Sequence, residues 1–404
     1  MITDMNDKNR DSLIEHTRSL VRIPSRSSAD GGEEGAVQQV VADRMRELGA
    51  RLHTFEARDI PGFFEHPLCH GPWRQYDGRP TVVGEIGPSD APALLVLAHS
   101  DTVQIGNPSE WTVDPFGGIV KDGAIWGLGS SDDKWGLATM FVILEALQAA
   151  GRPLNKRIIF ASTIDEENGV GNGMLLLHLA GVQAESALYL DGYRMVVLVG
   201  NMGGSTLFFS PKEPLSADDL SSHENRLRAM CDELSRQREH LYDRPLYREN
   251  ITRRSSVAFM PGYGTGPAFK IGFYTFPEDD KDSYLAEIMS AIQNALGDAA
   301  ASYNVACREP WFEPSLPPLD TPLIGYLSDS IRSVLGVEPQ MSTISKQDSF
   351  ILNNHASIPV VAFGCQPNLN ERGAFHMPDE KIGLEEVWNG CRIAYETVCR
   401  WLAR

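Results

Sequence analysis

The sequence predicts an α/β catalytic domain, with helices on both faces of a mixed, largely parallel sheet, interrupted by a smaller α+β insert. From residue 93 to residue 190, short apolar segments alternate with helical ones, an order typical of a largely parallel sheet covered by helices. After residue 203 the order changes to strand, helix, strand, strand, helix, strand, which is typical of a ferredoxin-like unit. The chain has 404 residues, more than one hydrophobic core usually supports, so two domains are expected.

Apolar runs and their stop signals place the elements of the catalytic domain. The run 93–99 suits a buried strand, because it is short and ends in polar residues. A long apolar helix is expected over 135–150, where Gly151 and Pro153 stop it. The remaining elements expected before residue 202 are helices over 11–22, 35–50 and 174–180, and strands over 156–163 and 186–190.

The insert has its own expected elements. Ser216 begins a capping pattern, and a long polar helix follows it to about residue 242. The expected strands cover 205–210, 254–260, 268–276 and 302–308, and a second helix covers 282–296. A proline-rich linker over 310–322 returns the chain to the catalytic domain, which a helix, a strand and a helix complete over 323–335, 358–363 and 384–401. The expected division is 1–202 and 313–404 for the catalytic domain, and 203–312 for a lid or dimerisation insert.

The composition favours a cytoplasmic protein that acts on a small molecule. The formal net charge of −18 argues against nucleic acid or an anionic membrane as a partner, because both require a basic face. No run of about 18 apolar residues is present, and the polar N-terminus lacks the apolar core of a signal peptide. The six cysteines are scattered without a C-x-x-C pair, which indicates reduced, structural thiols.

Each expected strand of the catalytic domain is followed by side chains that bind metals. In an open α/β sheet, ligands bind where the strands end. Two histidines with several carboxylates are typical of a catalytic zinc, cobalt or manganese site. Each side chain alone is explained as well by a satisfied loop or a solvated turn, but their joint occurrence favours a metal site. These side chains are His99, Asp101, Asp132, Asp165, Glu166, Glu167, Asp191 and His376.

Four motifs in this order give the sequence a recognisable pattern. They are His99-Ser-Asp101, the run from Asp114-Pro-Phe to Gly127-x-Gly129-x-x-Asp132-x-Lys134, Asp165-Glu166-Glu167, and His376-x-Pro378-Asp-Glu380. With them the chain resembles the zinc aminoacylase, acetylornithine deacetylase and succinyl-diaminopimelate desuccinylase family of dinuclear metallopeptidases. The likeness covers the interrupted catalytic domain, including Asp348, and is poor over the insert.

The resemblance implies a role for each matching position. Two divalent metal ions are implied, with zinc first and cobalt or manganese as alternatives. The implied ligands are His99 and Asp191 for one ion, Glu167 and His376 for the other, and Asp132 as the bridge. Glu166 is implied as the general base, with a helix N-terminal carboxylate as its alternative reading. Asp101 lies two residues after His99, on the same side of an extended segment, and is expected to orient that imidazole.

The implied reaction is hydrolysis of the amide bond of a small N-acyl amino acid, dipeptide or related compound by a metal-bound hydroxide. The resemblance also implies a homodimer. Two alternatives stay open: a hydrolytic deaminase of an unusual, perhaps aromatic, amine, and an inactive metal-binding scaffold. Glu166 favours an enzyme, because a scaffold has no need of a base beside its metals.

The insert departs from the family pattern. The family places a histidine in a His-Ser-Ser context, and the nearest candidate is His223, whose neighbours predict the surface of a helix. The family's Asp-x-Arg clamp for a substrate carboxylate is absent, and Lys346 is the hypothetical replacement as anion anchor. A segment over 62–73 with His66, Cys69 and His70 fits no common zinc spacing, so it is expected to form a pocket rim or to pack.

Two other enzyme classes are disfavoured. Gly127-x-Gly129-x-x-Asp132 imitates a dinucleotide-binding fingerprint, but the third glycine is missing and Asp132 would repel a pyrophosphate. No G-x-S-x-G elbow is present, which argues against a serine hydrolase of the α/β type.

Overall fold

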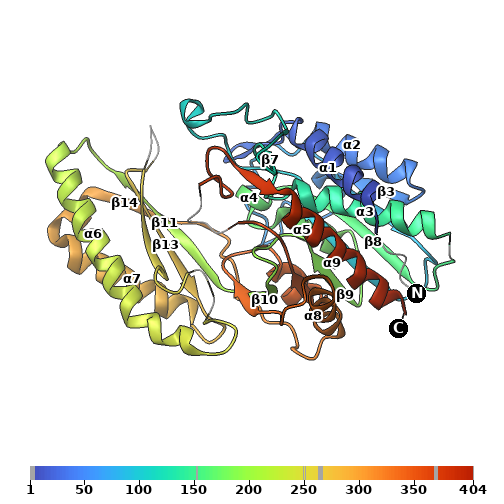
Figure 1. The fold of residues 1–404 in the computed structure, drawn as a ribbon. Coiled ribbons are helices and arrows are strands. Elements are labelled where there is room, and N and C mark those ends of the chain that lie inside the picture. The colour runs from blue at the N-terminus through green and yellow to red at the C-terminus, as the bar shows by residue number, and fades with distance from the viewer. Residues whose placement is uncertain are drawn as a thin grey trace. The chain divides into compact units, whose positions relative to one another are not determined.

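A computed structural model describes residues 5–151, 153–248, 250, 252–262, 267–367 and 372–403 (Figure 1). They form two compact units. The first unit comes from the ranges 1–199, 317–341 and 351–404, and the second from 200–316 and 342–350. The second unit contains the whole range expected for the insert. It also takes in 342–350, which the sequence-based division placed in the catalytic domain.

A mixed sheet forms the centre of the first unit, where its strands follow the order β10-β16-β9-β5-β8-β4-β3. The neighbours β16, β9, β5 and β8 run parallel, whereas β10, β4 and β3 pair antiparallel at the two sides. The predicted mixed, largely parallel sheet is therefore confirmed. The strands are β3 (Arg51–Phe55), β4 (Thr81–Ile86), β5 (Ala93–His99), β8 (Arg157–Thr163), β9 (Ser186–Tyr189), β10 (Val197–Asn201) and β16 (Val360–Ala362). A further strand, β15 (Met341–Ile344), lies almost wholly in the range 342–350.

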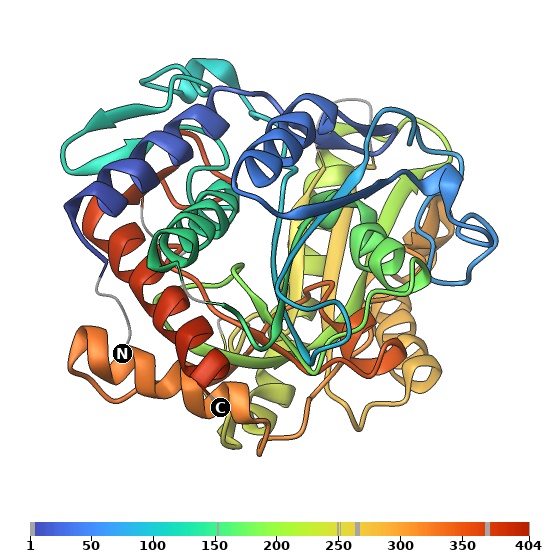
Figure 2. The same ribbon diagram turned by 90° about the vertical axis from the view of Figure 1, so that its right-hand side faces the viewer.

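Helices cover this sheet. In Figure 2, α1 (dark blue), α3 (green) and α9 (red) run side by side, and α3 packs against β5. The first eleven residues of α3 are all buried, and it ends at Gly151 in the left-handed region with φ 61°, as the stop signal predicts. The helices are α1 (Asp7–Val21), α2 (Gly35–Glu47), α3 (Lys134–Ala150), α4 (Glu166–Gly169), α5 (Asn172–Leu179), α8 (Pro322–Leu335) and α9 (Leu384–Ala403). Within the described part of the chain, none combines the length and apolar character needed to span a bilayer.

Shorter elements complete the first unit. A small sheet has the order β17-β7-β6, and a second one pairs β1 with β2. Their bounds are β1 (Ser27–Ser28), β2 (Gly31–Gly32), β6 (Ile119–Lys121), β7 (Ala124–Trp126) and β17 (Lys381–Gly383). Single turns of 3-10 helix lie at Ala57–Asp59 and Pro108–Glu110, and a π-helical turn lies at Ile351–His355.

The second unit is an antiparallel sheet in the order β12-β13-β11-β14 with two helices on one face (Figure 1). Along the chain its elements run β11, α6, β12, β13, α7, β14, so the expected ferredoxin-like order is confirmed. Leu227 of α6 and Ile288 of α7 are fully buried against Phe209 and Phe273 of the sheet. The bounds are β11 (Gly203–Pro211), α6 (Ala217–Arg238), β12 (Val257–Pro261), β13 (Phe269–Thr275), α7 (Lys281–Leu296) and β14 (Tyr303–Cys307), with 3-10 turns at Glu239–Asp243 and Gly297–Ser302.

Glu145 of α3 joins three helices of the first unit. Its carboxylate accepts hydrogen bonds from Ser12 Oγ at 2.7 Å and Arg44 Nη2 at 2.5 Å, and it lies 2.8 Å from His16 Nε2. Burial alone would raise the pKa of Glu145, but these partners on α1 and α2 lower it to about 2. The ionised carboxylate is therefore the form that stabilises the helix packing.

Replacing Glu145 with Gln tests these contacts between the three helices through the pH dependence of stability. The folded-state pKa lies below the ordinary value of 4.5, so the contribution is complete above pH 4.5 and is lost as the pH falls towards 2. Across that window we expect wild type to lose about 2 kcal/mol more unfolding free energy than Glu145→Gln. Urea unfolding at several pH values measures the difference. Glu47→Gln is the control, because Glu47 also pairs with Arg44 but is largely exposed. Parallel pH profiles for wild type and Glu145→Gln would contradict the prediction.

Candidate active site

Parallel pairing brings three polar strand ends to one edge of the sheet. His99, the last residue of β5, lies opposite Thr163 of β8, and Leu97 lies opposite Tyr189 of β9. The chain continues from β8 into Glu166 and Glu167, and from β9 into Asp191. These side chains therefore meet although they are far apart in the sequence.

Two groups of side chains at this edge could each hold a metal ion. One consists of His99, Asp132 and Asp191, and the other of Asp132, Glu167 and His376, with the ligand atoms of each group within 4.8 Å of one another. Asp132 belongs to both groups. Its Oδ1 lies 2.9 Å from His99 Nε2, and its Oδ2 lies 3.1 Å from His376 Nε2. The structure thus brings together all five residues that the resemblance implies as ligands.

The donor set and its charge fit divalent cations. Each group offers one imidazole nitrogen and two carboxylates, a combination suited to zinc and its neighbours. Burial opposes ionisation of Asp132, but His376 and His99 hold the pKa of this carboxyl well below its usual range. Burial likewise opposes a charge on His99, yet the Asp101 and Asp132 carboxylates raise the pKa of this imidazole well above its ordinary value. Buried carboxylates so placed demand positive charge beside them.

The two groups differ in exposure. His99 is fully buried, and Asp132 and Asp191 are each 7% exposed. The side chain of His376 is 43% exposed, whereas that of Glu167 is 4% exposed. Gln366 Nε2 donates a hydrogen bond to Asp191 Oδ1 at 2.9 Å, which orients that carboxylate.

Asp101 fixes the start of α4. Its Oδ1 accepts the backbone N–H of Glu166 at 3.1 Å, and its Oδ2 accepts that of Glu167 at 3.0 Å. The His99 ring is oriented mainly by the backbone of Asp101, because Nδ1 lies 3.1 Å from the carbonyl oxygen and 3.5 Å from Oδ1. The Asp101 carboxylate therefore serves the general-base candidate more directly than it serves the imidazole.

Glu380 fixes the turn that presents Asp132, a contact that sequence analysis missed. Its carboxylate accepts hydrogen bonds from the backbone N–H groups of Gly129 and Ser131 at 2.9 Å and of Asp132 at 3.2 Å. Burial raises the pKa of Glu380 to about 7. Gly129 has φ 79°, and a Cβ there would lie 2.5 Å from Thr102 Cγ2, so the glycines of the fingerprint-like motif serve this close turn.

Two predicted substrate-binding residues lie in the second unit. Lys346 Nζ donates to the Ser205 carbonyl oxygen at 3.2 Å and lies over the Tyr274 ring. His223 is 7% exposed, and its Nδ1 lies 2.8 Å from Tyr303 Oη. The interpretation of His223 as a helix-surface residue was wrong, because α6 turns this face towards the sheet. A substrate-binding role for either residue stays a prediction.

The segment 62–73 packs within the first unit. Phe63 is fully buried and meets Tyr76 edge to face, and Cys69 is buried with its thiol free. Among the described residues, the groups able to hold a metal include neither His66, Cys69 nor His70. The expectation of a packing role agrees with these contacts. Arg74 and Arg79, which no sequence pattern marks, follow this segment and have buried side chains.

The α/β fold and its two ligand groups are those of a metal-dependent hydrolase. The chain belongs to peptidase family M20/M25/M40, whose model matches residues 95–400. The resemblance found in the sequence is confirmed, and the protein is an enzyme that hydrolyses amide bonds.

Individual relatives are distant. The succinyl-diaminopimelate desuccinylase of Rhodospirillum centenum is 24% identical over 410 residues, which cover 96% of this chain and 97% of that enzyme. The desuccinylase of Beijerinckia indica subsp. indica is 29% identical over 178 residues, which span 43% of this chain and 41% of that enzyme. The crystal structure of human carnosine dipeptidase 1 has a TM-score of 0.71 at 14% identity, covering 98% of each chain. A Bacillus subtilis protein described as a dinuclear metal binding peptidase has a TM-score of 0.54 at 14% identity, covering 98% of this chain and 99% of that one. The two structures show a shared fold.

Replacing Glu380 with Ala tests the support of the Asp132 turn. Three backbone N–H groups lose their acceptor, so the turn becomes more mobile and Asp132 occupies a wider range of positions. We expect the affinity for Zn²⁺ to fall about 10- to 100-fold, as is common when outer contacts of a metal ligand are removed. Titration of the metal-free protein measures it. Glu385→Ala, at an exposed site on α9, is the control. Unchanged affinity in a folded Glu380→Ala protein would show that the turn holds without this carboxylate.

Proposed function

We propose that this protein is a dinuclear metal-dependent hydrolase that cleaves the amide bond of a small N-acyl amino acid, dipeptide or related compound. The single observation that carries the proposal is the position of Asp132 between His99 and His376, shared by two ligand groups. A carboxylate that belongs to both ligand groups suits a site with two adjacent ions.

The residues that would hold the ions are His99, Asp132 and Asp191 on one side, and Asp132, Glu167 and His376 on the other. Zn²⁺ suits this donor set best, and Co²⁺ or Mn²⁺ are the alternatives. Such ions, when bound, would polarise the substrate carbonyl and lower the pKa of a bound water molecule.

Glu166 acts as the general base and then as the general acid. It takes a proton from the attacking water as the water oxygen bonds to the carbonyl carbon. It returns the proton to the leaving nitrogen as the C–N bond breaks, so the products are a carboxylic acid and an amine. Asp101 holds the Glu166 backbone N–H at 3.1 Å, which limits the movement of this residue during the transfer.

The relatives favour substrates with an anionic group near the amide. The similar desuccinylases are named for an acyl group that carries a carboxylate, and the similar dipeptidase for a dipeptide. Lys346 is our proposed anchor for such a group, since the Asp-x-Arg clamp is absent from this sequence. A homodimer and a cytoplasmic location stay predictions.

Glu166→Gln tests the chemistry. The amide cannot accept the proton from water, so we expect kcat to fall about 10²- to 10⁴-fold while both ions stay bound. Product release is measured on a panel of N-acyl amino acids, dipeptides and aryl amines, with enzyme loaded with zinc, cobalt or manganese. Glu185→Gln, at an exposed site, is the matched control. Turnover that survives in Glu166→Gln would contradict the assigned base, and silence of wild type with two ions bound would favour the scaffold alternative.

Lys346→Met tests the anchor through pH. Burial, with Arg308 adding to it, lowers the pKa of Lys346 to about 7, so the ammonium is present below pH 7 and lost above it. In wild type we expect KM for an anionic substrate to rise about tenfold from pH 6 to pH 8, following the charged fraction. The KM of Lys346→Met should be high and flat over that range. Lys212→Met, an exposed site in the same unit, should behave as wild type. An unchanged KM in Lys346→Met would rule the anchor out.

A further inference from the structure

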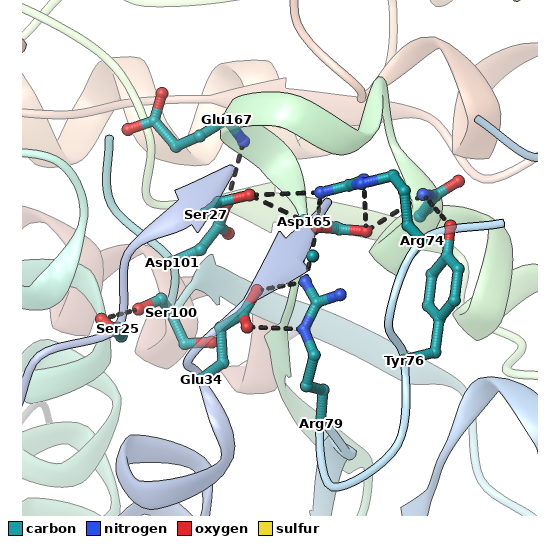
Figure 3. A network of polar contacts seen from close by, with 12 residues as sticks. Ser25, Ser27, Glu34, Arg74, Tyr76, Arg79, Ser100, Asp101, Asp165 and Glu167 are labelled. Carbon is teal, nitrogen blue, oxygen red and sulfur yellow. Dashed lines mark hydrogen bonds and ion pairs between the residues drawn. The ribbon is translucent and has the colours of Figure 1, made fainter. Parts of the chain in front are cut away.

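Asp165 precedes the proposed base but faces away from the metal-ligand groups. Figure 3 shows its carboxylate between the guanidinium groups of Arg74 and Arg79. Arg74 donates to both oxygens at 2.8 Å, and Arg79 Nη2 donates to Oδ1 at 2.5 Å. Asn172 Nδ2 donates to Oδ2 at 3.0 Å. Both oxygens are therefore occupied by donors of the chain itself.

Arg79 also binds a second carboxylate. Its Nε and Nη2 donate to Glu34 at 2.7 and 2.6 Å, and its Nη1 donates to the Gln75 carbonyl oxygen at 2.7 Å. The four charged side chains are almost completely excluded from solvent, at 0 to 2% exposure. The close packing needs Gly32, because a Cβ there would lie 2.2 Å from Glu34 Oε2. Two arginines and two carboxylates thus form a closed cluster with balanced charge.

The backbone links this cluster to the proposed chemistry. Asp165 has φ 63°, a left-handed conformation that a non-glycine residue holds only when its surroundings fix it. The next two N–H groups, of Glu166 and Glu167, are held by Asp101 at 3.1 and 3.0 Å. Two sets of contacts therefore hold the turn. The arginines bind the Asp165 side chain, and Asp101 binds the backbone N–H groups that follow it.

We infer that Arg74 and Arg79 are positioning residues, which act through Asp165 to fix the general base Glu166 and the metal ligand Glu167. Stability alone explains the cluster poorly, because the cost of desolvating buried ions offsets most of their attraction. Bidentate arginine–carboxylate contacts instead supply fixed geometry. The inference rests on the proposed function, since it assigns the cluster to the same site.

The test compares Arg74→Met and Arg74→Lys with wild type. In Arg74→Met, Asp165 keeps Arg79 and Asn172 as partners but loses the bidentate contact. We expect kcat for an amide substrate to fall about 10- to 100-fold with KM changed about twofold or less. Arg74→Lys keeps the positive charge but loses the bidentate contact. Its kcat should lie between those of Arg74→Met and wild type. Arg332→Met is the control, because Arg332 binds the carboxylates of Glu338 and Asp329 at an exposed site on α8.

A second readout separates positioning from a general loss of structure. Titration of the metal-free proteins with Co²⁺ should show one of the two ions bound about 10- to 100-fold more weakly in Arg74→Met, and the other unchanged. If the role were purely structural, both ions would bind more weakly. Thermal unfolding shows whether each variant is folded. If Arg74→Met does not fold, Arg74→Lys decides by the same two measurements. Wild-type kcat together with wild-type Co²⁺ affinities in a folded Arg74 variant would overturn the inference.

The proposed function has its own control in this experiment. If wild type turns over and Glu166→Gln does not, the function stands whatever the Arg74 variants do. If wild type is inactive on the whole panel, the function fails, and the Co²⁺ titration of the Arg74 variants still decides whether the arginines position the ligand Glu167.

Discussion

The carboxyl ends of β5, β8 and β9 meet because these three strands run parallel and in register. Three of the five candidate metal ligands and the proposed base depend on that pairing. His99 closes one strand, the segment with Glu166 and Glu167 follows the second, and Asp191 follows the third. A shift of one residue in any of them would turn its side chains to the opposite face. The apolar interior of the sheet therefore fixes the register, and the register fixes the distances between the candidate ligands.

In each of two motifs, one side chain faces the candidate metal groups and another supports the segment that carries a ligand. Glu167 faces the candidate metal groups, while Asp165 turns back to two arginines. The His376 motif works in the same way, since His376 faces Asp132 and Glu380 turns back to hold the Asp132 turn. A carboxylate that must stay in place beside like charges needs hydrogen bonds or ion pairs to the segment that carries it, because mutual repulsion would otherwise move it.

The parts of this structure that could be predicted from the sequence are those marked by a local hydrophobic pattern or by a local motif. The apolar runs placed β5, β8 and β9, and the strand ends pointed to the site. The edge strand β3 was missed because it is mostly exposed and lacks an apolar run. Arg74 could not be connected to Asp165, which lies 91 positions away, since no local periodicity marks that contact. His223 was misjudged because helix spacing alone does not show which face a sheet will cover.

The sharing of Arg79 between Glu34 and Asp165 has a consequence for how this enzyme can change over evolution. Among the described residues, loss of Arg79 leaves Glu34 without its ion-pair partner, and loss of Asp165 leaves Arg74 without its own, so compensating changes are expected to accompany either loss. Both arginines lie in the long connection before β4, in which Phe63 and Tyr76 are also buried. We therefore expect homologues that keep Glu34 and Asp165 to keep both arginines as well.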